Sequence, residues 1–386
     1  MIPYGRQDVN DDDIRAVLEV LRSEFLTQGP AVPRFEQTVA AHCQIPYAVA
    51  VNSATSALHI ACLALDVGPG DCVWTTPNTF VASANCARYC GAGVDFVDVE
   101  PGTWNMSVTA LHEKLARAAK QSRLPKVVIP VDFGGQSCSL SEIRELADEY
   151  GFKILEDASH AIGGSYRGRP VGCGAYADIT VFSFHPVKIV TTAEGGVAVT
   201  ANSSLARRMA RLRTHGLTRD PMEMEGGCDG PWYYQMVELG WNYRMTELQA
   251  ALGVSQMSRL QEFITRRRSL ADRYDHLLAG SSLLLPKRDP FAESSWHLYV
   301  IGWSEERTRK SRKSAFEELR AKGVGVNVHY IPVHLQPYYR QLGFSEGQFP
   351  VAEQYYMNAL SIPLYPGMTD AMQDRVVAAL EATLGA

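Results

Sequence analysis

The chain has 386 residues, of which 46% are hydrophobic and 20% are charged. This composition is ordinary for a globular protein and excludes an intrinsically disordered chain. The 37 basic and 42 acidic residues leave a formal net charge of −5, which argues against nucleic acid as a partner because a polyanion attracts a basic surface. The sequence also holds no apolar run of about 18 residues, so we expect no contact with a membrane interior.

Eight cysteines are spread along the chain without a single Cys-x-x-Cys pair. Disulfide frameworks are typical of short secreted chains, and closely paired cysteines are typical of structural zinc sites. We therefore expect free thiols and no metal site. The opening residues lack the apolar core of a signal peptide, and together these features favour a cytoplasmic protein.

The first two thirds of the chain alternates between short apolar runs and helical patterns. A helix is predicted over residues 11–25, where apolar residues recur at helical spacing. Strands are then predicted at 48–51, 72–75, 94–97, 127–131, 153–155, 179–182 and 196–199, and helices near 55–65, 79–90, 107–120 and 139–150. Valine-rich and isoleucine-rich strands that alternate with helices predict crossover connections, and hence an α/β domain with a mostly parallel sheet.

The last third of the chain has a different pattern. Residues 246–278 read as one continuous helix, long enough to bridge two domains. Beyond it, strands are predicted at 296–303 and 324–330 and helices at 308–322 and 369–384. We therefore expect a large α/β domain over residues 1–250 and a smaller α+β domain over residues 251–386.

Lys188 lies in a polar loop, Ser183–Gly196, between two predicted strands. A lone lysine in a loop is usually a solvated surface residue. This one follows a strand end, where the active sites of α/β sheets collect. A lysine that acts as a Schiff-base nucleophile needs such a partly desolvated setting, because burial lowers its pKa.

Asp157 directly follows a predicted buried strand, and His160 lies three residues further on. Taken alone, the aspartate reads as a turn acid or a helix cap, and the histidine as a structural residue. The functional alternative is that Asp157 pairs with a pyridinium nitrogen and keeps that ring protonated, so that the ring accepts electrons from a substrate carbanion. His160 would then lie against the same ring.

A strand ending at Val51 is followed by small polar residues that open a helix at Ala54 and Thr55. The N-terminus of a helix carries free N–H groups and a positive dipole end, so this turn is a plausible phosphate site. The signal is weak alone. A phosphate site, then a strand-end aspartate, then a loop lysine is typical of a pyridoxal phosphate enzyme.

Five segments carry a resemblance to a known family: Thr76–Ser83, Glu156–Ala161, the Lys188 loop, Leu239–Met245 and Val328–Tyr338. With them, the chain from Phe25 to the last helix resembles the DegT/DnrJ/EryC1/StrS sugar aminotransferases, which have the aspartate aminotransferase fold, fold type I. Within this family it is most similar to the 4-aminotransferases of pseudaminic acid biosynthesis, which act on UDP-4-keto-6-deoxy-N-acetylhexosamines.

The resemblance implies a role for each matching residue. Lys188 would bind pyridoxal phosphate as a Schiff base and move the proton of transamination, and Asp157 would pair with the pyridine nitrogen. The other expected cofactor contacts are Ala54, Thr55 and Ser183 at the phosphate, Phe80 stacked on the ring, His160 at the ring hydroxyl, and Asn242 at the phosphate from a second subunit. The residues expected around the substrate are Tyr4, Thr27, Arg244, His329 and Tyr330.

Two departures from the family pattern lie in the lysine loop. Ala193 stands where relatives usually have glycine, and Ile189-Val190 replaces the common Pro-Ile. An alanine fits that position only where φ is negative, so we expect a slightly reshaped loop there. Neither departure removes a reacting group.

The expected activity is transamination of a nucleotide-linked keto sugar, with glutamate as amino donor and a homodimer that shares its active sites. The sugar itself stays open, and 3-keto and dTDP-4-keto sugars are alternatives to the UDP-4-keto sugar. Two further alternatives are a related dehydratase, which carries histidine at the lysine position, and a regulator on the same fold without catalysis. The presence of both Lys188 and Asp157 argues against these last two.

Overall fold

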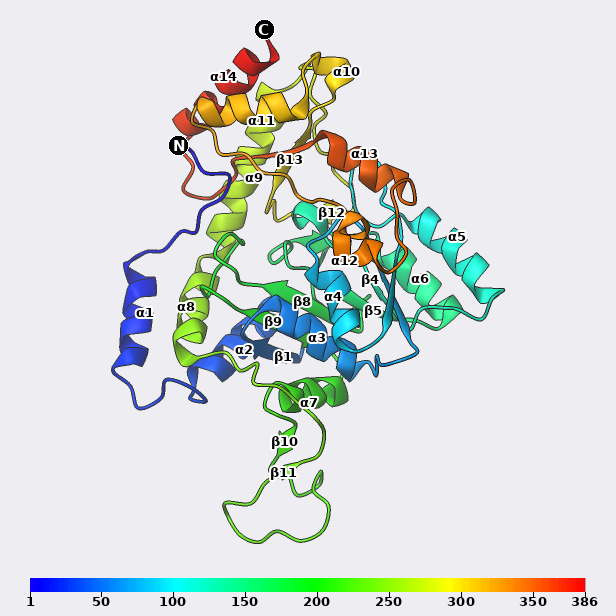
Figure 1. Ribbon diagram of the computed structural model, residues 1–386. Helices are drawn as coiled ribbons and strands as arrows, with labels where there is room; N and C mark the ends of the chain where they lie inside the picture. Colours follow the sequence, from blue (N-terminus) through cyan, green and yellow to red (C-terminus); the bar gives the residue numbers. More distant parts are fainter. Residues whose placement is uncertain (386) are drawn as a thin grey trace.

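The computed structural model describes residues 1–385, and a seven-stranded sheet lies at its centre (Figure 1). The strands are β1 (Tyr47–Val51), β2 (Cys72–Thr75), β3 (Gly93–Phe96), β4 (Val127–Ile129), β5 (Lys153–Asp157), β8 (Ile179–Ser183) and β9 (Gly196–Thr200). Their order is β1-β9-β8-β5-β4-β2-β3. Only β9 runs against its neighbours in this sheet, so the prediction of a mostly parallel α/β sheet is confirmed.

Helices cover both faces of this sheet. Those packed on it are α2 (Ala31–Cys43), α3 (Ala54–Ala64), α4 (Ala82–Tyr89), α5 (Val108–Ala119), α6 (Leu140–Tyr150), α7 (Ser203–Leu212) and α8 (Glu247–Ser258). Along β8, Ile179 and Val181 face α3, α4 and α7, whereas Phe182 faces α2 and α8. This alternation follows from the two-residue period of a strand, and it explains why the strands are apolar on both sides.

A smaller unit is built around two antiparallel strands, β13 (Tyr299–Gly302) and β14 (Ala359–Ile362). The helices of this part of the chain are α9 (Leu260–Leu277), α10 (Glu305–Thr308), α11 (Arg312–Ala321), α12 (Pro337–Arg340), α13 (Pro350–Asn358) and α14 (Asp370–Leu384). Its hydrophobic core also takes in Ile2 from the start of the chain. Both chain ends therefore lie at this end of the molecule (Figure 1).

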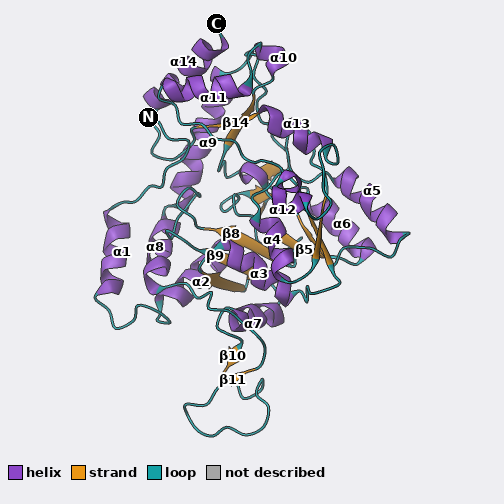
Figure 2. Cartoon of the chain, in the orientation of Figure 1, coloured by secondary structure: helices purple, strands orange, loops and turns teal. Residues whose placement is uncertain are grey.

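The remaining elements are short or peripheral. They are α1 (Asp11–Leu21), the small sheet of β6 (Ser165–Tyr166), β7 (Arg169–Pro170) and β12 (Ala292–Glu293), and the hairpin of β10 (Leu217–Thr218) and β11 (Gln235–Met236). The hairpin and its long loop project from the body at the end opposite the chain termini (Figure 2).

Two predicted elements are corrected by the structure. The helix predicted over 246–278 is two helices, because the chain breaks at Arg259, whose φ and ψ are −103° and 5°. The strand predicted over 324–330 is absent from the part of the chain that the structure describes. There, Val324 and Asn327 make isolated bridges to Ile2 and Ser361 on different neighbours.

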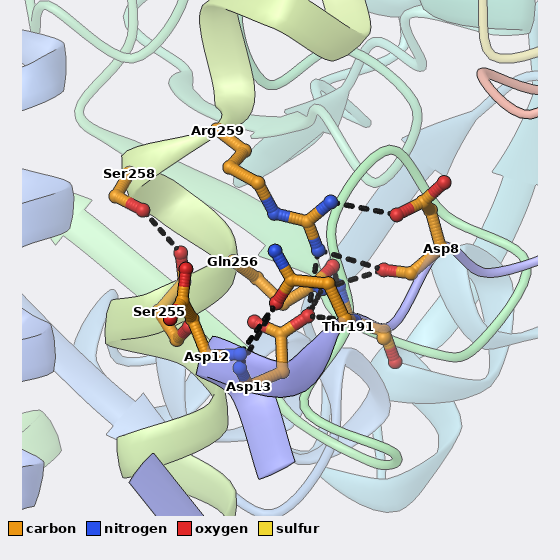
Figure 3. A network of polar contacts seen from close by, with 9 residues as sticks. Asp8, Asp12, Asp13, Thr191, Ser255, Gln256, Ser258 and Arg259 are labelled. Carbon is orange, nitrogen blue, oxygen red and sulfur yellow. Dashed lines mark hydrogen bonds and ion pairs between the residues drawn. The ribbon is translucent and has the colours of Figure 1, made fainter. Parts of the chain in front are cut away.

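A polar network surrounds the break between α8 and α9 (Figure 3). The Arg259 guanidinium binds the Asp8 and Asp13 carboxylates, each at 2.6 Å. The buried Gln256 amide donates to Oδ2 of Asp13 at 2.7 Å and accepts from the N–H of Thr191 at 3.4 Å. The network thus joins the N-terminal segment, the helix break and the loop that carries Lys188.

The two hydrophobic cores meet within α9. Leu260 and Phe263 pack with the core of the large unit, whereas Leu270 and Tyr274 pack with the core of the small one. We therefore propose two domains that divide in the middle of α9, about 15 residues beyond the boundary expected from sequence, with Ile2 in the smaller domain.

Within residues 1–385, no helix is long and apolar enough to cross a bilayer. The eight cysteines are all free thiols.

Candidate active site

A cavity of about 460 Å³ opens where β1, β5 and β8 end. The large unit supplies most of its wall, and the small unit and the N-terminal segment close one side. Ten residues that the sequence analysis selected line it: Tyr4, Ala54, Thr55, Phe80, Asp157, His160, Ser183, Lys188, His329 and Tyr330. Residues that are distant in the sequence meet here because the carboxyl ends of parallel strands share one edge of the sheet.

The first turn of α3 forms one wall of the cavity. Ser53 caps this helix with its side-chain oxygen, which accepts from the N–H of Ser56 at 3.1 Å. The N–H groups of Ala54 and Thr55 precede the first intrahelical bond and are free to bind an anion. Gly196 packs against this turn so closely that a Cβ there would lie 2.5 Å from the Ala54 nitrogen. Glycine is therefore required at that position of β9.

Asp157 ends β5 and is almost fully buried, with 4% of its surface exposed. Its Oδ2 accepts from the Ser83 hydroxyl at 2.6 Å, and its Oδ1 accepts from the Ser159 hydroxyl at 2.5 Å and N–H at 3.1 Å. The bond to the backbone of Ser159 makes Asp157 a turn acid as well. The bonds from two serines also hold its carboxylate in one orientation at the cavity wall.

Lys188 follows the tight turn that begins at His185 and is partly buried in the cavity wall. Burial lowers the pKa of Lys188 to about 8, and the negative charge of Asp157 opposes that shift. A substantial share of the amine is therefore neutral near physiological pH. A neutral amine is the nucleophilic form.

His160 meets the small domain at the back of the cavity. Its Nδ1 accepts from the N–H of Gly134 at 3.3 Å, and its Nε2 lies 3.1 Å from the hydroxyl of Tyr330. Burial lowers the pKa of His160 well below its usual value, and the nearby Lys188 and His329 lower it further. Burial also raises the pKa of Tyr330, so the phenol stays protonated.

Phe80 and His329 also line the cavity. Phe80 is 58% exposed, because its ring stands at the open mouth of the cavity, 6.2 Å between centroids from the Tyr330 ring. His329 is buried, and its Nδ1 lies 2.7 Å from the Ser361 hydroxyl. Burial and the charge of Lys188 lower the pKa of His329 to about 3, so this imidazole is neutral.

Sequence reasoning missed several residues that line the cavity, and four of them have polar side chains that make contacts within the site. Ser83 and Ser159 hold Asp157, and His185 and Glu194 stand 3.9 Å apart in the cavity wall. Ser83 ends the Thr76–Ser83 segment, so its place in that segment is the signal for it. Nothing in the sequence pairs Ser83 with Asp157, 74 residues away.

Three predicted residues, Thr27, Asn242 and Arg244, do not line the cavity among residues 1–385. Thr27 and Asn242 are exposed, and Arg244 is half-buried. The backbone of the Asn242 segment lies beside the end of β1, where the Tyr243 carbonyl accepts from the N–H of Asn52 at 2.9 Å. The segment therefore lies near the first turn of α3, although the Asn242 and Arg244 side chains do not line the cavity of their own chain.

The expected backbone at Ala193 is wrong. Its φ is +65°, in the left-handed region that favours glycine. The loop keeps the shape that a glycine would adopt, and its N–H bonds to Oγ1 of Thr191 at 3.0 Å. Holding an alanine there costs about 1–2 kcal/mol.

The assembled site can be compared with known proteins. Residues 7–381 match the profile described as the DegT/DnrJ/EryC1/StrS aminotransferase family. The chain belongs to this family. Over 382 residues it is 38% identical to the spore coat polysaccharide biosynthesis protein SpsC of Bacillus subtilis, covering 98% of this chain and 96% of that protein.

Solved aminotransferase structures agree with this assignment along the whole chain. Helicobacter pylori PseC, an aminotransferase involved in the biosynthesis of pseudoaminic acid, is 29% identical with a TM-score of 0.91, covering 100% of this chain and 99% of that one. The putative sugar aminotransferase Spr1654 of Streptococcus pneumoniae, in its PMP form, is 31% identical with a TM-score of 0.88, at 100% and 99% coverage. The chain is thus a pyridoxal phosphate-dependent sugar aminotransferase of fold type I.

The cavity fits this cofactor. Free N–H groups at Ala54 and Thr55 suit a phosphate, and the buried Asp157 carboxylate suits a protonated ring nitrogen. Lys188 offers an amine of lowered pKa for an aldehyde. The exposed face of Phe80 offers a surface for a flat ring.

Proposed function

We propose that this chain aminates the C4 keto group of UDP-2-acetamido-2,6-dideoxy-hexos-4-ulose, with glutamate as the amino donor. The observation that carries the proposal is the full-length likeness to H. pylori PseC, at a TM-score of 0.91. The relation to SpsC, which serves the synthesis of a spore coat polysaccharide, also supports a role in making a surface glycan.

The cofactor roles of the lining residues follow from their chemistry. The first turn of α3, at Ala54 and Thr55, and the Ser183 hydroxyl bind the phosphate, and Phe80 orients the ring. Asp157 would pair with a protonated ring nitrogen, because its buried carboxylate is fixed at the cavity wall by hydrogen bonds from two serines. When bound, pyridoxal phosphate supplies an electron sink for negative charge that develops on the neighbouring carbon.

Lys188 is the group that moves the proton. Its amine would hold the cofactor at the aldehyde carbon, and the same amine, when free, would accept and release a proton within the cavity. A pKa of about 8 suits this task, because the amine both accepts and releases a proton near neutral pH.

The substrate side of the cavity is assigned to Tyr4, His329 and Tyr330, which approach from the N-terminal segment and the small domain. Because the pKa of His329 is about 3, His329 offers a neutral ring to the sugar rather than a charge. A cavity of about 460 Å³ would hold the cofactor together with a sugar ring, and the nucleotide would lie toward the exposed Phe80.

We further propose a cytoplasmic homodimer in which Thr27, Asn242 and Arg244 complete the cavity of the partner. None of these three side chains lines the cavity of its own chain among residues 1–385. Large apolar side chains are also uncovered on the same parts of the chain: Met222, Trp232, Met236 and Leu239 near the β10–β11 hairpin, and Ile14, Leu18, Leu21, Phe25 and Leu26 on and after α1. Uncovered apolar surface of this extent favours a protein partner.

The second candidate is amination of a 3-keto or dTDP-4-keto sugar. The family match leaves both the nucleotide and the position of the keto group open. A dehydratase or a regulator without catalysis is disfavoured, since Lys188 and Asp157 both stand in the cavity.

The test is to incubate the purified protein with pyridoxal phosphate, glutamate and a panel of UDP- and dTDP-linked 3-keto and 4-keto sugars. Mass spectrometry detects an amino sugar, and NMR locates its amine. We expect a 4-amino-UDP-sugar and an equal amount of 2-oxoglutarate, neither of which forms with Lys188→Ala. Faster amination of a dTDP-linked or 3-keto sugar would favour the second candidate.

A further inference from the structure

The two ring nitrogens of His160 have different partners. Gly134 carries an N–H that points at Nδ1 from 3.3 Å, so Nδ1 must present its lone pair. Nε2 faces the Tyr330 hydroxyl at 3.1 Å, and this hydroxyl has no other hydrogen-bond partner among residues 1–385. The backbone of His160 is fixed as well, because the Ser295 hydroxyl donates to its carbonyl at 2.7 Å.

The surroundings of His160 keep its ring neutral. It is 5% exposed and lies 4.5 Å, between ring centroids, from His297, which is equally buried. Burial is the main cause that lowers the pKa of both histidines.

The charged and titratable groups that act on these two rings come from several elements and are all cationic or basic: Lys188 from the loop before β9, Arg267 from α9, and His329 from the segment before α12. Asp157 acts on Tyr330 instead and raises the pKa of its phenol. No carboxylate therefore stabilises a protonated His160 in the part of the chain that the structure describes.

Arg267 is the unusual member of this set. It is 1% exposed, and its guanidinium donates to the carbonyls of Trp296, His297 and Leu364 at 3.0–3.3 Å. Within residues 1–385 it has no carboxylate partner. A buried cation bound to the backbone of His297 penalises a second positive charge on the neighbouring rings.

We propose that His160 is a positioning residue that donates its Nε2 proton to the Tyr330 hydroxyl, so that Tyr330 presents the hydrogen-bond donor to the bound ligand. A neutral imidazole carries one proton, and the N–H of Gly134 excludes it from Nδ1. The proton is then on Nε2, and the Tyr330 oxygen accepts it. Among residues 1–385 the phenol hydrogen then has no acceptor, so Tyr330 offers it to an acceptor oxygen of a ligand bound in the cavity.

This assignment differs from the family expectation that His160 itself meets the ring hydroxyl. It rests on the proposed function only for the ligand, which is either an oxygen of the cofactor ring or an oxygen of the sugar. The arrangement of protons is a property of the protein alone.

The first test reads the protons directly. The unliganded protein is labelled with ¹⁵N-histidine, and the His160 signals are identified as those missing from His160→Gln. We expect a neutral ring with its proton on Nε2 that does not titrate between pH 6 and 9. A proton on Nδ1, or an imidazolium at neutral pH, would overturn the proposal whether or not the protein is active.

The second test compares His160→Gln, His160→Leu, Tyr330→Phe and the double variant His160→Leu/Tyr330→Phe in the loaded enzyme. A glutamine side chain has an acceptor for the Gly134 N–H and a donor for the Tyr330 hydroxyl, as the neutral ring does. The kcat/KM of His160→Gln should therefore stay within about 3-fold of the parent. His160→Leu and Tyr330→Phe should each lose roughly 10-fold in kcat/KM, the scale of one hydrogen bond. The double variant should lose no more than Tyr330→Phe, because both changes remove one donor. Losses that multiply would contradict the proposal.

The affinity of each unloaded variant for pyridoxal phosphate, measured by fluorescence quenching, identifies the acceptor. Weaker cofactor binding in Tyr330→Phe and His160→Leu, with His160→Gln unchanged, places the acceptor on the cofactor. A raised sugar KM with unchanged cofactor affinity places it on the sugar. If neither quantity moves in Tyr330→Phe, the hydroxyl has no ligand and the proposal is wrong. If no sugar of the panel is aminated but the ¹⁵N spectrum is as expected, the proposed function alone is refuted.

Discussion

The Ser83 hydroxyl donates a 2.6 Å hydrogen bond to Oδ2 of Asp157 and also lies 2.7 Å from the Thr79 hydroxyl. Ser83 belongs to the first turn of α4, whereas Asp157 ends β5. The first turn of α4 therefore lies against the carboxyl end of β5, although the two elements are far apart in the sequence. The carboxylate is aligned by this contact and by Ser159, and not by any residue adjacent to it on the sheet.

We expect Asp157→Asn to bind pyridoxal phosphate and to lose roughly 10²-fold or more in kcat/KM, because an amide does not hold a charge on the ring nitrogen. Ser83→Ala should lose roughly 10-fold, since it removes one hydrogen bond to a charged group. Ser258→Ala, an exposed serine on α8, is the matched control and should equal the parent. Normal turnover in Asp157→Asn would mean that Asp157 has only a structural role in its turn.

The lowered pKa of Lys188 predicts how the unloaded protein captures pyridoxal phosphate. The neutral amine increases as the pH rises through its pKa, so covalent capture, trapped with borohydride and mapped by peptide mass spectrometry, should rise with a midpoint near pH 8. A surface lysine would need a pH near about 10.4. Lys188→Arg should fold, keep its charge and trap nothing at this position. A midpoint above pH 10 would show that burial does not lower the pKa.

Ala193→Gly should stabilise the protein. The substitution removes about 1–2 kcal/mol of strain at a φ of +65°, and the greater freedom of glycine in the unfolded chain takes back about 0.4–1 kcal/mol. We expect a net gain of about 0.5–1 kcal/mol in urea unfolding. Ala119→Gly, at an exposed position in α5, is the control and should destabilise. A loss of stability in Ala193→Gly would mean that the loop adopts a negative φ in solution.

The shared active site predicts rescue between two inactive proteins. In a mixed dimer of Lys188→Ala and Arg244→Glu, one cavity carries both lesions and the other carries neither, so co-expression should restore part of the activity. Activity of a purified heterodimer with two different tags is the measurement. If Arg244 serves its own chain, every cavity is defective, and a heterodimer without activity would refute the sharing.

The sequence predicts those parts of the fold that depend on local pattern. The strands of the central sheet were found because they are apolar on both faces and bounded by turns, and Lys188 and Asp157 were found because they follow strand ends. Helix α2 was not predicted, because its cap is not local. Pro30 offers no side-chain cap, and the N–H groups of Ala31 and Val32 bond instead to the Glu247 carboxylate, more than 200 residues away.

The break between α8 and α9 was missed for a similar reason. It contains no glycine or proline to signal a stop, and the Arg259 side chain at the break binds Asp8 and Asp13 from the start of the chain. Ser83 and Gly134 likewise act on Asp157 and His160 through contacts that a sequence pattern does not reveal.

The place of Ile2 in the core of the small domain has a consequence for synthesis. Its backbone bonds to the Gly323 carbonyl at 2.8 Å and to the Gly325 N–H at 2.7 Å, and its side chain packs among residues 270–380. Ile2 thus completes a core whose other members lie between residues 270 and 380. The central sheet can form while the chain is still growing, but the small domain forms only after those later residues have been made. The cavity that His329 and Tyr330 line is therefore completed later than the central sheet.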